Sequence, residues 1–170
     1  MRPDLQIKIA SPADLPSIQR IAQVAWRPTY GAILPEEQSQ FMLDWMYNDT
    51  TLRKSMEDKT TFLLALENEN PVGFAAFKPK EEGMVKLHKI YFLPDRQGRG
   101  YGRILLNEVS RQATEKGGLY LELNVNRSNN ARNFYEKLGF EYVRDEDNYI
   151  GRGYWMNDYV LRKPLTEYAQ

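Results

Sequence analysis

The most informative part of this 170-residue chain is the stretch Asp95-Arg96-Gln97-Gly98-Arg99-Gly100-Tyr101-Gly102-Arg103. It follows an apolar run, Val85 to Leu93, that Pro94 stops, and it leads into residues 101–113, where apolar side chains recur at helical spacing. Glycines at alternate positions let the backbone adopt positive φ and approach a ligand closely. The N-terminus of the following helix adds unpaired N–H groups, so the turn predicts a diphosphate site to which nearby arginines add charged contacts.

Three other interpretations of this turn are open. The spacing is not Gly-x-Gly-x-x-Gly, and no acidic residue stands at the ribose-binding offset, which disfavours a Rossmann site. A P-loop is disfavoured because the Lys-Ser/Thr pair after the last glycine is missing. The third interpretation is a surface turn with solvated arginines, and the turn taken alone does not separate it from an anion site.

Turn residues and apolar periodicity divide the rest of the chain into elements. Strands are predicted at residues 5–9, 61–66, 72–77, 85–93 and 119–125, with two more between 140 and 163 around turns at 145–148 and 151–153. Helices are predicted from a Ser11 N-cap with Asp14 in a capping box, over 101–113 and 131–138, and in pieces from Trp26 to Met56 with breaks at Pro28, Gly31 and Pro35. The order favours one α+β domain over residues 1–170 around a largely antiparallel sheet.

The composition excludes several kinds of chemistry. Lys+Arg and Asp+Glu both number 23, so no global positive field draws the chain to nucleic acid or to a membrane. There is no cysteine and one histidine, His88, which excludes disulfides, thiolate nucleophiles and an ordinary zinc site. The first residues lack an apolar segment of signal-peptide length, and no run reaches the ~20 residues of a membrane span, so we expect a cytoplasmic protein.

Two motifs resemble those of the GNAT superfamily of acetyl-CoA-dependent N-acetyltransferases. Gln97 to Gly102 is similar to its Gln/Arg-x-x-Gly-x-Gly/Ala signature, and Asn129 to Phe140 is similar to its second cofactor motif, which ends in Phe-Tyr-Glu-Lys-x-Gly-Phe. The segment from Trp26 to Met56, with residues 158–165, is faintly similar to polyamine acetyltransferases. The resemblance implies a mixed, mostly antiparallel sheet of six to seven strands, about four flanking helices and two central strands that splay apart.

The resemblance also implies where the cofactor binds. The pantetheine arm of acetyl-CoA is expected between the splayed strands, where it bonds backbone groups left unpaired, and the diphosphate is expected on the glycine turn. The implied cofactor contacts are Ile90, Tyr91, Phe92, Arg96, Gln97, Gly98, Arg99, Gly100, Tyr101, Gly102, Arg103, Asn129, Asn133, Tyr135 and Lys137. No metal is implied.

The resemblance suggests roles for the chemistry of acetyl transfer. A backbone N–H near Phe92 is expected to polarise the thioester carbonyl. Tyr135 is expected to be the general acid, because a phenol with a pKa of ~10 is protonated at neutral pH and can protonate the departing sulfur. Its other interpretation is a core aromatic residue. For the general base, the positions that hold a Glu in many relatives carry Lys86 and Asn124, which leaves His88, Glu122 or a chain of water molecules.

The acceptor is expected to be an amine, either a small one such as a polyamine or an amine of a protein. Aromatic walls for it are predicted from Trp26, Tyr30, Tyr47, Tyr154 and Trp155, although each could instead belong to the core. The acidic residues Glu36, Glu37, Asp44 and Asp49 could attract a polycation or simply solvate a helix face. The alternative function is a non-catalytic acyl-CoA-binding or regulatory domain, and a homodimer is compatible with either function.

Overall fold

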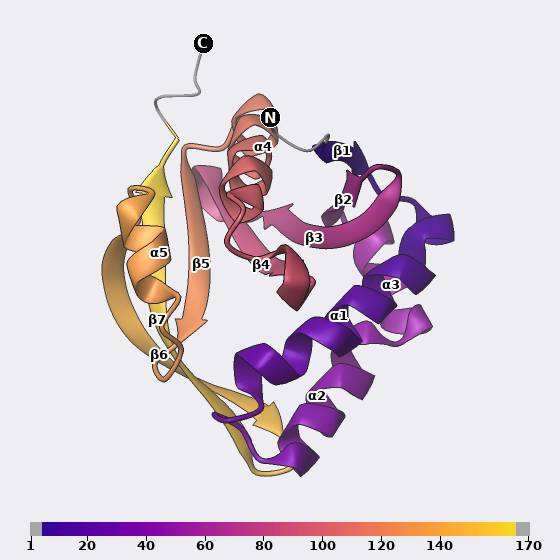
Figure 1. The fold of residues 1–170 in the computed structure, drawn as a ribbon. Coiled ribbons are helices and arrows are strands. Elements are labelled where there is room, and N and C mark those ends of the chain that lie inside the picture. The colour runs from indigo at the N-terminus through magenta and orange to yellow at the C-terminus, as the bar shows by residue number, and fades with distance from the viewer. Residues whose placement is uncertain (1–4, 166–170) are drawn as a thin grey trace.

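The computed structural model describes residues 5–165, in which seven strands form one sheet (Figure 1). The strands are β1 (Leu5–Ile9), β2 (Thr61–Glu67), β3 (Asn70–Pro79), β4 (Met84–Phe92), β5 (Tyr120–Asn126), β6 (Glu141–Gly151) and β7 (Tyr154–Pro164). The α-helices are α1 (Leu15–Tyr30), α2 (Glu36–Tyr47), α3 (Asp49–Glu57), α4 (Tyr101–Glu115) and α5 (Arg132–Lys137). Residues 1–4 and 166–170 of the predicted domain lie outside the described part.

The spatial order of the strands is β1-β2-β3-β4-β5-β7-β6. Every neighbouring pair is antiparallel except β4 and β5, which α4 connects as a crossover and which are therefore parallel. The prediction of a mixed, mostly antiparallel sheet is confirmed. None of the helices within residues 5–165 is long and apolar enough to cross a membrane.

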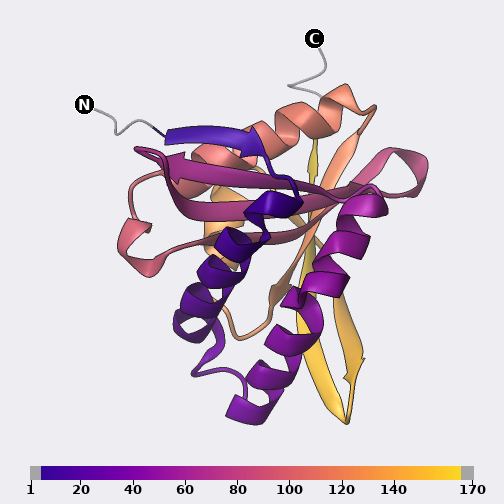
Figure 2. The same cartoon turned by 90° about the vertical axis from the view of Figure 1, so that its right-hand side faces the viewer.

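Side chains on alternate sheet residues build two separate cores, because successive strand residues point to opposite faces. On one face, α4 and α5 pack on the apolar residues of β4, β5 and β7. On the other face, α1, α2 and α3 pack mainly on β2 and β3. Figure 2 shows α1 and α2 side by side on this second face, next to the long hairpin of β6 and β7.

The predicted start of the first helix is confirmed. Ser11 and Asp14 form a capping box, in which the Asp14 carboxylate accepts a hydrogen bond from the Ser11 backbone N–H at 2.9 Å. The predicted break at Pro28 is wrong, since Pro28 lies within α1, which continues to Tyr30. Pro28 removes one i→i−4 hydrogen bond in the last turn of α1, and the helix ends two residues later at Tyr30.

The predicted turn at residues 145–148 is also wrong, because these residues lie inside β6 and pair with β7 from Asp145↔Tyr159 to Asn148↔Met156. Pairing with β7 keeps this turn-prone sequence extended, and Asp147 forms an ion pair of 2.7 Å with Arg127. The hairpin instead reverses at residues 151–153, where Arg152 and both glycines have positive φ.

The two parallel strands separate halfway along their length. β4 and β5 pair only from Met84↔Tyr120 to Leu87↔Leu123. The next residue, His88, is a bulge, since Leu87 pairs with Phe77 of β3 and Lys89 pairs with Ala76. Beyond the bulge β4 follows β3 while β5 follows β7, so the predicted splay of the central strands is present.

Candidate active site

The opening between the splayed strands holds a cavity of about 520 Å³. Its walls are residues 87–92 of β4, 123–125 of β5, the segment 128–131, and residues 28–30 and 32–33 at and after the end of α1. Tyr135 of α5 and Gln97 complete the lining. The second cofactor motif, which includes residues 129–131 and Tyr135, therefore lies beside the end of α1. No sequence pattern places these two segments together.

A second cavity of about 370 Å³ lies over the glycine turn and is lined by residues 96–98, 100–103 and 134–135. Both cavities are lined by Ile90, Phe92, Gln97 and Tyr135. The two cavities therefore adjoin at these four residues, one over the glycine turn and the other in the opening between the strands.

The glycine turn presents its backbone to the second cavity. Gly98 and Gly100 have φ of 78° and 79°, a conformation that favours glycine. A Cβ at either position would meet no atom within 4 Å, so this side of the turn is open. Within residues 5–165 the N–H groups of residues 98–100 donate to no protein atom. They adjoin the start of α4, whose first N–H groups also lack partners in a preceding turn. Such a turn suits a diphosphate.

Glu67, at the end of β2, holds this turn from behind. Its carboxylate accepts hydrogen bonds from Arg96 Nε at 2.8 Å, from Arg99 Nη1 at 3.4 Å and from the Tyr101 hydroxyl. The Tyr101 hydrogen bond, together with Arg96, keeps the pKa of Glu67 below its usual value in spite of partial desolvation. Two of the three arginines predicted to contact phosphate therefore bind Glu67, whereas Arg103 lines the second cavity without an ion pair to an acidic residue in the described part.

We expect Glu67→Gln to raise KM for acetyl-CoA about tenfold with little change in kcat, because the turn loses the charged partner that orders it. Steady-state kinetics with acetyl-CoA as the varied substrate measures this. Glu115→Gln, on the exposed end of α4, is the control. A fall in KM would show instead that Glu67 withholds the two arginines from the phosphates.

Tyr135 lies where the two cavities meet. Its ring packs edge-on against Phe134 and Phe140, and the residue is 9% exposed. No residue in the described part hydrogen-bonds to its hydroxyl, which is not fully enclosed, so the hydroxyl is free to contact a ligand. Burial raises the pKa of Tyr135 well above its usual value, so the phenol remains a proton donor at neutral pH.

His88 and Glu122, predicted as base candidates, have different surroundings. His88 lines the cavity, yet desolvation and the surrounding lysines Lys89, Lys86, Lys80 and Lys78 lower its pKa to about 4, although the residue remains exposed to solvent. Its imidazole is therefore neutral at pH 7 but a weak base. Glu122 does not line either cavity and is 3% exposed.

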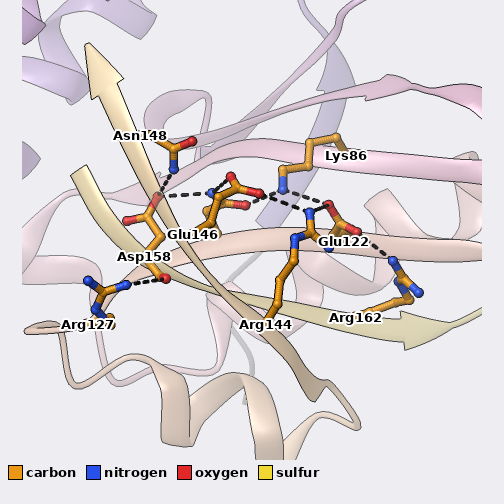
Figure 3. Close-up of polar contacts among 9 residues, drawn as sticks. Lys86, Glu122, Arg127, Arg144, Glu146, Asn148, Asp158 and Arg162 are labelled. Atoms are coloured by element: carbon orange, nitrogen blue, oxygen red, sulfur yellow. Dashed lines mark hydrogen bonds and ion pairs between the residues drawn. The ribbon is translucent and has the colours of Figure 1, made fainter. Parts of the chain in front are cut away.

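Glu122 belongs to a polar network that links β4, β5, β6 and β7 (Figure 3). Its two oxygens accept hydrogen bonds from Lys86 Nζ and Arg162 Nη2, each at 3.0 Å. Burial by itself raises the pKa of Glu122, but these hydrogen bonds outweigh it and hold the pKa below its usual value. Asn124 also belongs to the network, since its amide donates to Glu146 and Asp158, each at 3.0 Å. Lys86 and Asn124, the two positions at which many relatives hold a Glu, therefore both belong to the polar network between these strands.

We expect Glu122→Gln to lower the free energy of unfolding by about 3 kcal/mol at pH 7, because Lys86 and Arg162 lose their buried counter-charge. The folded pKa lies below the unfolded one, so this stabilisation is present above the unfolded pKa and is lost as the pH falls through the folded pKa. The difference from wild type should therefore begin to shrink as the pH falls past the unfolded pKa of ~4.3, and vanish only below the folded pKa.

Urea unfolding at several pH values checks this expectation, with the surface variant Glu115→Gln as the control. Turnover per folded molecule should be retained in Glu122→Gln. Full stability combined with a large loss of kcat would support a base role for Glu122 instead.

The predicted acceptor residues are not all beside the cavity. Tyr30 lines it. Trp26 is 1% exposed and belongs to the core between α1 and the sheet, so the structure does not support acceptor contact. Tyr154 and Trp155 lie in the hairpin against α2, where the Tyr154 ring is 5.7 Å from Phe41 and the Trp155 carbonyl accepts from Gln38 at 2.9 Å.

Some residues predicted to contact the cofactor line a cavity, and others do not. Asn129 lines the cavity, and its Oδ1 accepts from the Ala131 N–H at 2.9 Å, which leaves its amide group for a ligand. Asn133 and Lys137 are exposed on α5 and line neither cavity. Sequence reasoning missed Glu67, because no local pattern connects a strand-end acid with a turn about 30 residues away.

Comparison with known proteins identifies relatives of this chain. Residues 16–140 match the family described as Acetyltransferase (GNAT) family. The [ribosomal protein bS18]-alanine N-acetyltransferase of Haemophilus influenzae is 35% identical over 113 residues, which cover 66% of this chain and 75% of that protein. The spermidine N(1)-acetyltransferase of Thermoplasma acidophilum is 27% identical over 165 residues, 94% of this chain and 96% of that protein.

Solved structures share the fold. The PaiA N-acetyltransferase from Thermoplasma acidophilum, in complex with coenzyme A, superposes with a TM-score of 0.81 at 26% identity, covering 95% of this chain and 99% of that one. The ribosomal-protein-S18-alanine N-acetyltransferase from Escherichia coli superposes with a TM-score of 0.72 at 23% identity, covering 95% of this chain and 94% of that one.

Proposed function

Since the chain belongs to the GNAT family of acetyltransferases and uses acetyl-CoA as its acyl donor, we propose that it transfers the acetyl group directly to an amine that enters the opening between β4 and β5. The observation that carries this proposal is the pair of adjoining cavities, with Tyr135 in the lining of both. A single ligand with a diphosphate at one end and a thioester at the other would extend across both cavities.

The residues present suit acetyl-CoA, which supplies an activated acyl group. The open N–H groups of residues 98–100 and the start of α4 would hold the diphosphate. The free edge of β4 beyond His88 would pair with the amides of the pantetheine arm. The Asn129 side chain lies beside the same edge.

One backbone N–H of β4 is oriented to polarise the thioester carbonyl. The Leu93 N–H donates to the Val72 carbonyl of β3 at 2.9 Å. Backbone groups of successive strand residues point to opposite sides, so the Phe92 N–H points toward the opening. We assign it as the donor to the carbonyl oxygen, and Tyr135 as the donor of a proton to the departing sulfur.

The acidic residues expected to attract a polyamine do not favour that acceptor. Glu36 forms an ion pair with Arg27, Asp49 forms one with Arg53, and none of the four predicted acids lines the cavity. The charges of these two acids are neutralised locally on helix surfaces. An amine of a protein or peptide is therefore the acceptor that we propose.

The direct test measures release of free CoA thiol from acetyl-CoA in the presence of peptides with free α-amines, lysine-containing peptides with blocked N-termini, and spermidine. We expect turnover with at least one peptide amine and weak turnover with spermidine. Calorimetric binding of CoA is measured in parallel. Tight CoA binding without turnover on any amine would overturn the proposal and leave the non-catalytic alternative.

A further inference from the structure

A row of lysines leads away from the acceptor side of the cavity. Lys89 of β4 lines the cavity and pairs with Ala76 of β3. Residues two apart on a strand share a face, so Lys78 and then Lys80 continue from Ala76 in one line. At about 3.3 Å per residue, the backbone from Ala76 to Lys80 spans about 13 Å. Besides desolvation, the charges of Lys89, Lys86, Lys80 and Lys78 lower the pKa of His88, in keeping with a row of lysines on this part of the sheet.

These three lysines have no acidic partner within residues 5–165. The Lys89 ammonium lies 5.3 Å from the centre of the Tyr47 ring and 5.9 Å from that of Phe62, and desolvation lowers its pKa to about 8. Lys78 stands directly opposite Lys86, a like-charge cross-strand pair that costs stability. Lys86 is neutralised by Glu122, whereas the row keeps its charge.

Acidic groups near the row do not cancel its charge. None of the residues lining the cavity is an aspartate or a glutamate. Glu146 and Asp158, behind Asn124, accept hydrogen bonds within the polar network. Glu81 and Glu82 follow Lys80 and form no ion pair with the row in the described part. An unpaired cation beside a cavity is stabilised when a bound anion pairs with it.

The missing base limits the kind of amine. Transfer requires a neutral amine, and an α-amine, with a pKa of ~7.7–8.0, is far closer to neutral at pH 7 than a lysine ε-amine at ~10.4. Nearby cations lower the pKa of a bound ammonium further, so the row itself favours the reactive form. The ammonium loses one proton to solvent, and the neutral nitrogen attacks the acetyl carbon. The C–S bond breaks as Tyr135 protonates the sulfur, and the new amide nitrogen gives up its second proton, which restores the phenol through solvent.

We propose that the acceptor is the α-amine of a peptide whose first residues are acidic, with the amine in the opening and the acidic side chains along Lys89, Lys78 and Lys80. We infer a peptide because of the length of the row. About 13 Å corresponds to about four extended residues, so a free amino acid is too short to contact all of the row. This inference rests on the proposed function, since it names the acceptor of the same site.

The experiment uses the full chain and three peptides of equal length that begin Ala-Glu-Glu-Glu, Ala-Gln-Gln-Gln and Ala-Lys-Lys-Lys. We expect kcat/KM for the acidic peptide to exceed that for the neutral peptide about tenfold at low salt, and the advantage to shrink as salt increases. The double variant Lys78→Glu/Lys80→Glu should abolish the preference. Lys116→Glu, on the exposed end of α4, should leave it unchanged.

Three outcomes would overturn the inference while the proposed function stands. They are equal rates for the acidic and neutral peptides, a preference for the basic peptide or spermidine, and an unchanged preference in the double variant. Absence of turnover on every amine, with CoA still bound, would overturn both. If the double variant does not fold, competitive inhibition of wild type by the acidic peptide with a blocked N-terminus decides: inhibition supports the inference, and its absence overturns it.

Discussion

Tyr135→Phe should lower kcat about 100-fold or more while the affinity for CoA changes less than about threefold, because the substitution removes only the hydroxyl that donates the proton. The ring remains to pack against Phe134 and Phe140, so the fold should be retained. Rapid-quench measurement of the acetyl-transfer step, with CoA binding by calorimetry, separates the two effects.

The control for this prediction is Tyr142→Phe, which removes a hydroxyl from an exposed tyrosine on β6 that bonds to Asp145 rather than facing the cavities. Its kcat should match wild type. Should Tyr135→Phe also retain the wild-type rate of the transfer step, Tyr135 is a core aromatic residue and a solvent molecule protonates the sulfur.

Gly100→Val should weaken CoA binding at least about 100-fold. A β-branched residue is strained at a φ of 79°, and its side chain would stand on the open side of the turn where the diphosphate is expected. Loss of the N–H contacts and of access removes several charge-assisted hydrogen bonds together. Calorimetry with CoA and with 3′-dephospho-CoA measures the effect.

Gly117→Val provides a matched control. Gly117 has a φ of 85°, and a Cβ at this position would likewise meet no atom within 4 Å, but the residue lies at the far end of α4. Both variants should lose similar stability, and only Gly100→Val should lose CoA binding. Equal CoA affinity in the two variants would remove the glycine turn from the binding site.

The glycine-turn motif is local, so its residues lie together. A glycine turn, a helix start and a strand end are consecutive in sequence, so residues 97–103, apart from Arg99, line one cavity. Of the second motif, Asn133 and Lys137 line neither cavity. The residues predicted for the acceptor lie in different parts of the structure. An aromatic residue suits both a core and the wall of an acceptor pocket, so the sequence does not distinguish them. Only the packing shows that Trp26 lies in the core and that Tyr154 lies against α2.

The sequence alone determined the order of the elements, the capping box at Ser11, the glycine turn and the kind of ligand expected on that turn, since periodicity, capping and positive φ are properties of neighbouring residues. Tertiary structure decided which charges meet. Glu122 is an ion-pair residue rather than an available base because strand order brings it to Lys86, 36 positions away, and to Arg162, 40 positions away. The row of Lys89, Lys78 and Lys80 exists because the bulge at His88 and the register of β3 with β4 place those side chains on one face.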